Sequence, residues 1–160
     1  MVLTDKTTFF ATTQAFEHVP YTQTRGMYEF HALSGVNRIK FFFNNEEQPT
    51  IACFAHEKTF GIFKMIIIEG ECYFDASKRN IEDIKKFYTE IREQAYDMVE
   101  VCSNAIYNFD YEIALRQAGY LRPVGQFSMP ITKIIDINNE IKCGSNWKRN
   151  LRKAKHHNLS

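Results

Sequence analysis

The chain has 160 residues, the length of one ordinary domain, and a chain of this size can bury a core without disulfides or metals. Hydrophobic residues make up 44% of it and aromatic residues 14%, which excludes a disordered or low-complexity protein. No apolar run approaches the ~20 residues that a membrane-spanning helix needs, and residues 1–6 lack the regions of a signal peptide. We therefore expect a soluble, cytoplasmic protein.

The formal net charge of +1 hides an asymmetry along the chain. All 19 acidic residues lie between Asp5 and Glu140, so residues 1–146 carry 15 basic against 19 acidic side chains, a balance of −4. Residues 147–160 carry five Lys or Arg and no acid, a balance of +5. This contrast indicates either an anionic partner for the tail or a solvated helix at the end of the chain.

The cysteines show no metal-binding or disulfide pattern. They stand about 20 to 40 residues apart, with no C-x-x-C and no histidine at ligand spacing. We expect reduced, mostly packed thiols and no metal; the four are Cys53, Cys72, Cys102 and Cys143.

The first part of the chain predicts two helices and a three-stranded antiparallel meander. Pro20 divides the helical segments, and Ser34-Gly35 ends the second of them. Polar turns then separate three β-rich runs, and a short extension follows at 72–75. The predicted helices are 8–16 and 22–34, and the predicted strands are 38–43, 50–56 and 61–68.

Residues 80–99 give the clearest periodicity. An apolar residue recurs at helical spacing along one face, and Asn80 is a suitable N-cap. A short strand at 100–103 follows, and a strand that returns after a crossover helix should pair in parallel. The predicted apolar face is Ile81, Ile84, Phe87, Tyr88, Ile91, Ala95 and Met98.

A second helix begins at Asp110 and ends before Gly119, which suits the left-handed position past a helix. Tyr111 lies on its apolar stripe, which favours core packing over a base-stacking role. Strands are then predicted at 120–127 and 131–137. The last helix, 146–158, has a narrow apolar stripe surrounded by basic side chains.

Three segments in this order resemble the Fem family of peptidoglycan-bridge aminoacyltransferases, the FemA, FemB and FemX type. Val19-Pro-Tyr-Thr-Gln23 is similar to the family's SP-x-x-Q entry, and Val99 to Ser103 followed by Ala-Gly-Tyr120 is similar to its strand, helix and GY strand start. Residues 131–137 and 147–155 together resemble the passage T-x-x-x-D-L … K-x-R-x-x-I-R-K-A.

The resemblance implies an α/β fold of the GNAT (acyl-CoA N-acyltransferase-like) type, a mixed sheet with helices on both faces. It covers the N-terminal half of a family member, so we expect a GNAT-like domain at 1–140. A basic helix at 141–160 would lead into a second domain that is absent from this chain, and the chain alone should have little or no transferase activity.

The function implied is transfer of an amino acid from aminoacyl-tRNA to the peptide stem of a peptidoglycan precursor, with possible peripheral contact with the membrane through that precursor. Four basic residues of the tail, Lys148, Arg149, Arg152 and Lys153, would bind phosphate of the tRNA or the precursor. The substrate cleft implied by the resemblance includes Gln23, Tyr28 and His31. The family has basic groups in this region, but this chain reads Tyr28-Glu-Phe-His31-Ala, without lysine.

No catalytic residue is identified from the sequence. His18, His31 and His56 are scattered and are interpreted as surface or partly packed residues, and Glu69, Glu71 and Asp75 as solvated acids at the end of a strand. No cofactor is expected, because the Gly-rich pyrophosphate loop of CoA-binding GNAT domains precedes neither Asn80 nor Asp110. Two alternatives stay open: a CoA-dependent N-acyltransferase, and a non-catalytic domain that binds nucleic acid or a partner.

Overall fold

A computed structural model describes residues 1–36, 38–78, 80–102 and 109–122, which belong to one compact unit. The elements of this unit, in chain order, are β1 (Val2–Thr4), α1 (Lys6–Thr13), the 3₁₀ turn η1 (Tyr21–Gln23), α2 (Arg25–Leu33), β2 (Ile39–Phe43), β3 (Ile51–Phe60), β4 (Phe63–Ile68), β5 (Cys72–Tyr73), the 3₁₀ turn η2 (Ala76–Lys78), α3 (Ile81–Arg92), β6 (Met98–Val101) and α4 (Phe109–Gln117).

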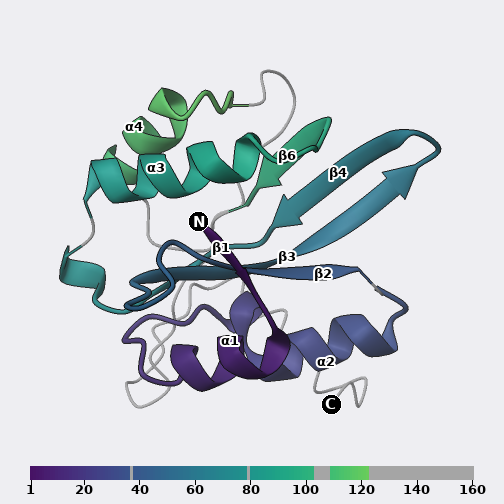
Figure 1. The fold of residues 1–160 in the computed structure, drawn as a ribbon, viewed down its shortest axis with the longest axis horizontal. Helices are drawn as coiled ribbons and strands as arrows, with labels where there is room; N and C mark the ends of the chain where they lie inside the picture. Colours follow the sequence, from purple (N-terminus) through teal and green to yellow (C-terminus); the bar gives the residue numbers. More distant parts are fainter. Residues whose placement is uncertain (37, 79, 103–108, 123–160) are drawn as a thin grey trace, which may run out of the picture. The chain divides into compact units, whose positions relative to one another are not determined.

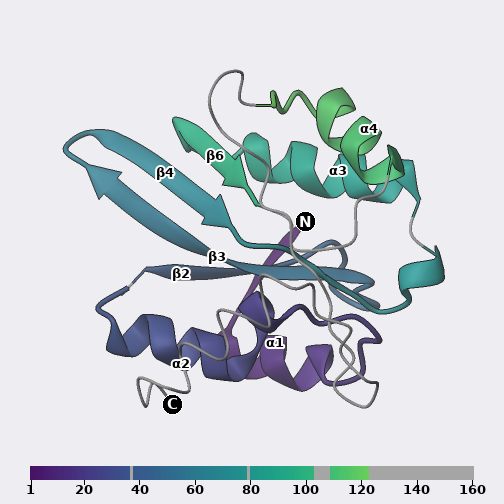
Figure 2. The ribbon, with the colours of Figure 1, turned by 180° about the vertical axis from the view of Figure 1, so that it is seen from behind.

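The sheet has the strand order β1-β2-β3-β4-β6, with β5 paired to β3. The predicted meander is confirmed, since β2, β3 and β4 pair antiparallel. β6 then pairs with β4 in parallel, with Ile68 opposite Val101, as the crossover through the helix predicts. Helices α1 and α2 cover one face and α3 and α4 the other (Figure 1, Figure 2). The fold class is thus the predicted mixed α/β sheet with helices on both faces, an arrangement compatible with a GNAT-like fold.

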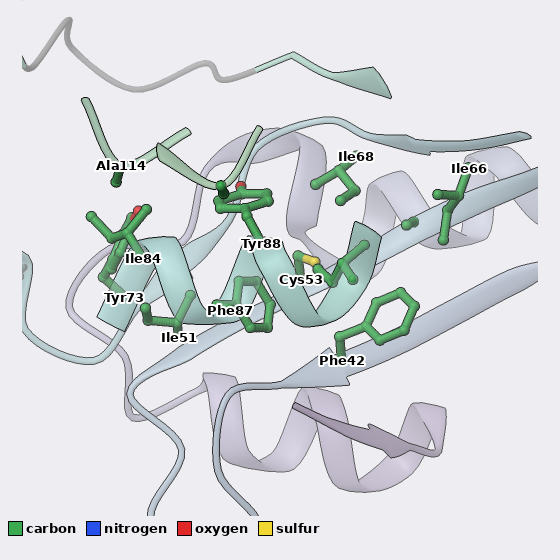
Figure 3. Close-up of a cluster of buried hydrophobic side chains, with 13 residues drawn as sticks. Phe42, Ile51, Cys53, Ile66, Ile68, Tyr73, Ile84, Phe87, Tyr88 and Ala114 are labelled. Atoms are coloured by element: carbon green, nitrogen blue, oxygen red, sulfur yellow. The ribbon is translucent and has the colours of Figure 1, made fainter. Parts of the chain in front are cut away.

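The two faces of the sheet carry separate apolar clusters because side chains alternate along each strand. The cluster under α3 and α4 includes Phe42, Ile66, Phe87 and Tyr88 (Figure 3). The cluster under α1 and α2 is almost wholly aromatic; its buried members are Phe9, Phe10, Phe16, Phe41, Phe43, Ala52, Phe54 and Cys72.

Side-chain caps define where the helices begin. The Asp5 carboxylate accepts hydrogen bonds from the backbone of Thr7 and Thr8, so α1 begins at Lys6 rather than at residue 8. Thr24 caps α2, which separates it from the turn η1 and corrects the single predicted helix 22–34. Asn80 caps α3 through the backbone N–H of Asp83, as predicted.

The predicted helix 80–99 is wrong at its end. α3 ends at Arg92, and Met98, predicted on the helix face, instead begins β6. The reason is a pairing with the edge of β4: the Lys64 N–H donates to the Asp97 carboxylate at 2.7 Å, and the Asp97 N–H donates to the Lys64 carbonyl at 2.9 Å. These bonds place the turn beside β4, and the following residues continue as a strand.

Strand β1 and the end of β3 differ from the expectation from sequence, whereas Gly119 agrees with it. Strand β1 was not predicted, because three residues are too few for a periodic pattern. β3 extends beyond 56 to Phe60, since it pairs with β4 through a hairpin at Gly61, whose φ is +61°. Gly119 has a φ of +87° past α4, as predicted.

The predicted strand 131–137, the predicted helix 146–158 and the expected domain boundary at 140/141 lie outside the described residues. So does the predicted strand 120–127 beyond its first three residues. Among the residues that are described, no helix is long and apolar enough to cross a membrane.

Candidate functional site

Polar residues gather where β4 and β6 end. Because these strands are parallel, their carboxyl ends lie at the same edge, with Glu69 following β4 and Cys102 following β6. The Cys102 N–H donates to the Ile68 carbonyl at 2.8 Å, so the pairing continues to the last residue of β4. Ligands of α/β sheets typically bind outside the carboxyl ends of parallel strands, so this edge is a candidate binding site.

Two histidines join Glu69 at this edge. His31 comes from the last turn of α2, and His56 comes from β3, opposite Ile67 of β4. Their ring centroids are 4.0 Å apart. The Glu69 Oε2 lies 3.7 Å from the Nε2 of His31 and 3.9 Å from the Nε2 of His56. Three chain segments therefore contribute one side chain each to a single group.

Both imidazoles carry a nitrogen that the fold does not satisfy. The Nε2 of His31 and the Nδ1 of His56 are buried and have no hydrogen-bond partner within the described part of the chain. A buried polar atom left unpaired costs about 1–3 kcal/mol. Burial, together with the neighbouring His31 and Lys58, lowers the pKa of His56 to about 4. His56 is thus neutral near pH 7, and a neutral imidazole can accept a proton or bind a cation.

The segment Val19–Gln23 holds Glu69 in position. The Thr22 hydroxyl and the Gln23 side-chain N–H both donate to the Glu69 carbonyl, the second at 3.3 Å. Gln23 also bonds the backbone of Phe54 in both directions, at 2.6 and 3.1 Å. The predicted cleft residue Gln23 is 1% exposed, so its amide braces the fold at the site.

The structure brings only one of the three predicted cleft residues into the group. Tyr28 packs its ring against Phe10 and Phe41, with centroids 5.6 and 5.8 Å away. His31 lies in the group itself. The predicted phosphate-binding residues Lys148, Arg149, Arg152 and Lys153 lie outside the described residues.

Two sequence interpretations are corrected here. His31 and His56 are packed, which the interpretation as surface or partly packed residues allows, but they are not scattered, since they meet across α2 and β3. Glu71 is not solvated: it is 2% exposed, and its carboxylate accepts hydroxyl hydrogen bonds at 2.7, 2.6 and 3.1 Å from Tyr73, Tyr88 and Tyr111. The expectation of no metal rests on cysteine spacing, which carries no information about a group of two histidines and a carboxylate such as His31, His56 and Glu69.

One sequence signal could have found His56. The run Ile51 to Ala55 is apolar and wholly buried, and a histidine that continues such a run on its buried face is unusual. No comparable signal exists for His31 and Glu69, because their proximity depends on how α2 packs against the end of β4.

The other acid and the thiols behave largely as expected. Asp75 lies at the end of the strand, as predicted. Hydrogen bonds from the side chains of Ser77 and Lys78 lower its pKa to about 2. Cys53 and Cys72 are buried free thiols, and burial raises the pKa of each. Cys102 is exposed, and Cys143 lies outside the described residues.

Searches of the sequence against known protein families and against curated proteins find no match. Among solved structures, the chain is similar to a probable acetyltransferase, at 12% identity and a TM-score of 0.46, over 80% of this chain and 90% of that one. It is also similar to TTHA1254 from Thermus thermophilus, at 12% identity and a TM-score of 0.46, over 85% and 99%. It is similar as well to a variant of BH1408 from Bacillus halodurans, at 15% identity and a TM-score of 0.44, over 82% of this chain and 100% of that one. The acetyltransferase-like match is weak and says nothing about substrate.

Proposed function

We propose that this chain serves acyl transfer to an amine, and that the acyl group is an amino acid delivered by aminoacyl-tRNA to the peptide stem of a peptidoglycan precursor. The mixed sheet and the polar site at its edge support the general activity, N-acyl transfer. The narrower statement, the donor and the acceptor, has the support of the three sequence segments that resemble the Fem family.

One observation carries this proposal: two of those segments, far apart in sequence, meet at the same edge of the sheet. The Val19–Gln23 segment holds the carbonyl of Glu69 through Thr22 and Gln23. In the segment that begins at Val99, Cys102 bonds the carbonyl of Ile68, the residue before Glu69. Segments that carry a common function are expected to converge on one site, and these two do.

The chemistry asks little of such a site beyond positioning. An aminoacyl ester is already activated, so the protein must hold the amine and the ester together and stabilise the oxyanion that develops. The carboxyl ends of a parallel strand pair are a rigid platform for that purpose. The half-exposed Glu69 side chain leaves the edge open to a substrate from solvent.

The start of α3 argues against CoA as the donor. In CoA-dependent GNAT domains a helix N-terminus binds the pyrophosphate, which requires free N–H groups and a positive local field. Here Asn80 caps α3, and Glu82 and Asp83 occupy its first turn. Two carboxylates at this position repel a pyrophosphate.

Binding measurements on this chain test the proposal. We expect saturable binding of a diphosphate-linked muramyl pentapeptide and of charged tRNA, and no comparable binding of acetyl-CoA, in parallel calorimetric titrations. Tight binding of acetyl-CoA without binding of the muramyl peptide would favour the CoA-dependent alternative instead. Salt-dependent RNA binding without any binding of the muramyl peptide would favour the non-catalytic alternative.

A transfer assay addresses the domain organisation that the resemblance implies. With labelled aminoacyl-tRNA and the muramyl peptide, we expect little or no transfer by residues 1–160, because their resemblance to the Fem family covers only the first of that family's two GNAT-like domains. Robust transfer by this chain alone would overturn that expectation and leave the acyl-transfer proposal standing.

A further inference from the structure

We infer that His31, His56 and Glu69 form a binding site for one divalent transition-metal ion of the Zn²⁺ class. The inference goes beyond acyl transfer and does not depend on it. It rests on the geometry, the burial and the donor chemistry of the three side chains.

The distances fit a single ion. The candidate ligand atoms of the three side chains all lie within 4.8 Å of one another. Two of these separations, from the Glu69 Oε2 to each histidine Nε2, are 3.7 and 3.9 Å. Ligand atoms about 2.1 Å from a tetrahedral zinc stand about 3.4 Å apart, so small side-chain rotations would close the group on an ion.

The contacts inside the group do not account for its burial. Neither histidine–glutamate separation is short enough for a hydrogen bond, and the side chain of His56 is 7% exposed. In addition, the Nε2 of His31 has no hydrogen-bond partner among the described residues. A metal ion at the centre would be the partner that this nitrogen lacks.

The donor set selects the class of metal. Two imidazoles and one carboxylate suit zinc and related first-row ions better than Mg²⁺ or Ca²⁺, which prefer oxygen ligands. Three protein ligands leave a fourth position open on a tetrahedral ion, as in zinc sites of the two-histidine, one-glutamate type. The Glu69 side chain is 36% exposed, so water can reach that position.

The surroundings hold the carboxylate ligand in place. Thr22 and Gln23 fix the backbone of Glu69 through its carbonyl oxygen. Gln23 in turn is bonded to Phe54, two residues before His56 on β3. The backbone atoms that carry two of the ligands are therefore linked before any ion binds, which reduces the ordering needed on binding.

Zinc and cobalt titrations of the full 160-residue chain test the site. The tail contains His156 and His157, which could bind metal themselves, so the titrations are made in a His156→Asn, His157→Asn background. We expect one Zn²⁺ per chain with a dissociation constant below about 10 μM, and a cobalt spectrum typical of four-coordinate nitrogen and oxygen ligands.

Single substitutions then assign the ligands. His31→Asn and Glu69→Gln should each weaken zinc binding by about 100-fold or more. His18→Asn, which removes a histidine outside the group, should leave it unchanged. Since His56 is buried and its substitution could unfold the protein, its role is read from the shift of its imidazole resonances when Zn²⁺ is added to the tail-substituted chain.

Two results would overturn the inference. One is loss of stoichiometric zinc binding in the tail-substituted background, which would assign the binding to the tail. The other is retention of full affinity in both His31→Asn and Glu69→Gln. Neither result bears on binding of the muramyl peptide or tRNA, so this inference and the proposed function fail separately.

Discussion

The side-chain amide of Gln23 pairs with the backbone of Phe54 in the way a neighbouring strand would. The Phe54 N–H donates to the Gln23 Oε1 at 2.6 Å, and the Gln23 Nε2 donates to the Phe54 carbonyl at 3.1 Å. The same Nε2 lies 3.3 Å from the carbonyl of Glu69. One buried amide thus connects the segment before α2, strand β3 and the end of β4.

Gln23→Ala should therefore destabilise the protein by about 2–3 kcal/mol, because it leaves buried backbone groups of Phe54 unpaired. Urea unfolding followed by circular dichroism measures the change. Gln48→Ala is the matched control, since Gln48 is exposed in the turn before β3 and its hydrogen bond to the Asn45 side chain uses only its backbone N–H. Equal stability of the two variants would refute the bracing role of Gln23.

Two glycines should respond in opposite directions to substitution by alanine. Gly119 has a φ of +87°, and a Cβ there would stand 1.5 Å from the guanidinium of Arg92, which donates to the Ala118 carbonyl. Gly119→Ala should lower the free energy of unfolding by about 1–2 kcal/mol through backbone strain alone. Gly26 lies inside α2, and a Cβ there would meet nothing within 4 Å, so Gly26→Ala should stabilise by about 0.5–1 kcal/mol. Thermal unfolding of both variants checks the two signs.

Alkaline pH should weaken the fold through its tyrosines. Burial and the Glu57 carboxylate raise the pKa of Tyr96 to about 12, and burial also raises the pKa values of Tyr88 and Tyr120. Because the folded-state values exceed the unfolded value of about 10, the stabilisation is full below about pH 10 and is lost as the pH rises through the folded-state values.

Tyrosinate absorbance and urea unfolding, both measured against pH, follow this loss. Tyr96→Phe should remove the part of the absorbance change that occurs near pH 12 and should flatten the stability profile there. Completion of the tyrosinate titration by about pH 11 in a protein that is still folded would show that these hydroxyls are not protected.

The basic residues of the tail should bind phosphate groups of the tRNA or of the muramyl diphosphate. The combined substitution of Lys148, Arg149, Arg152 and Lys153 by alanine is expected to weaken binding of tRNA or of the muramyl diphosphate. Each lost phosphate contact should reduce the salt slope of binding by about one. Folding should be nearly unaffected, because Lys and Arg are seldom buried in proteins and a solvated charge contributes on the order of 1 kcal/mol or less.

The control for the tail removes exposed lysines elsewhere, at Lys58, Lys64 and Lys86. It should change affinity and salt slope much less than the tail variant does, as measured by fluorescence anisotropy at several salt concentrations. If the tail variant keeps both its affinity and its salt dependence, the tail has no phosphate-binding role.

Most of the fold could be predicted from local patterns in the sequence. The β-rich runs of β2 to β4 and the helical spacing from Ile81 to Ile91 follow from neighbours in sequence, and the structure keeps them. The error at residues 93–99 has a non-local cause, since Asp97 pairs with the edge of β4 at Lys64. Helical spacing alone could not reveal that competing bond.

The candidate site depended still more on long-range packing. His31, His56 and Glu69 each lie on a different element, and no spacing in the sequence relates them. Glu71 shows the same difficulty: an acid in the polar run Glu69-Gly70-Glu71 reads as solvated, yet three tyrosine hydroxyls from β5, α3 and α4 enclose it. The sequence identifies residues of the right chemistry, and the tertiary fold determines which of them meet.

We propose that the edge formed by the ends of β4 and β6 binds the acceptor substrate, and amide chemical shifts can locate that binding. The protein, labelled with ¹⁵N, is titrated with the diphosphate-linked muramyl pentapeptide. We expect saturable shifts concentrated at His31, Glu69 and Cys102. Saturable shifts confined to the opposite face, over α3 and α4, or to the β3–β4 hairpin around Gly61 would contradict it.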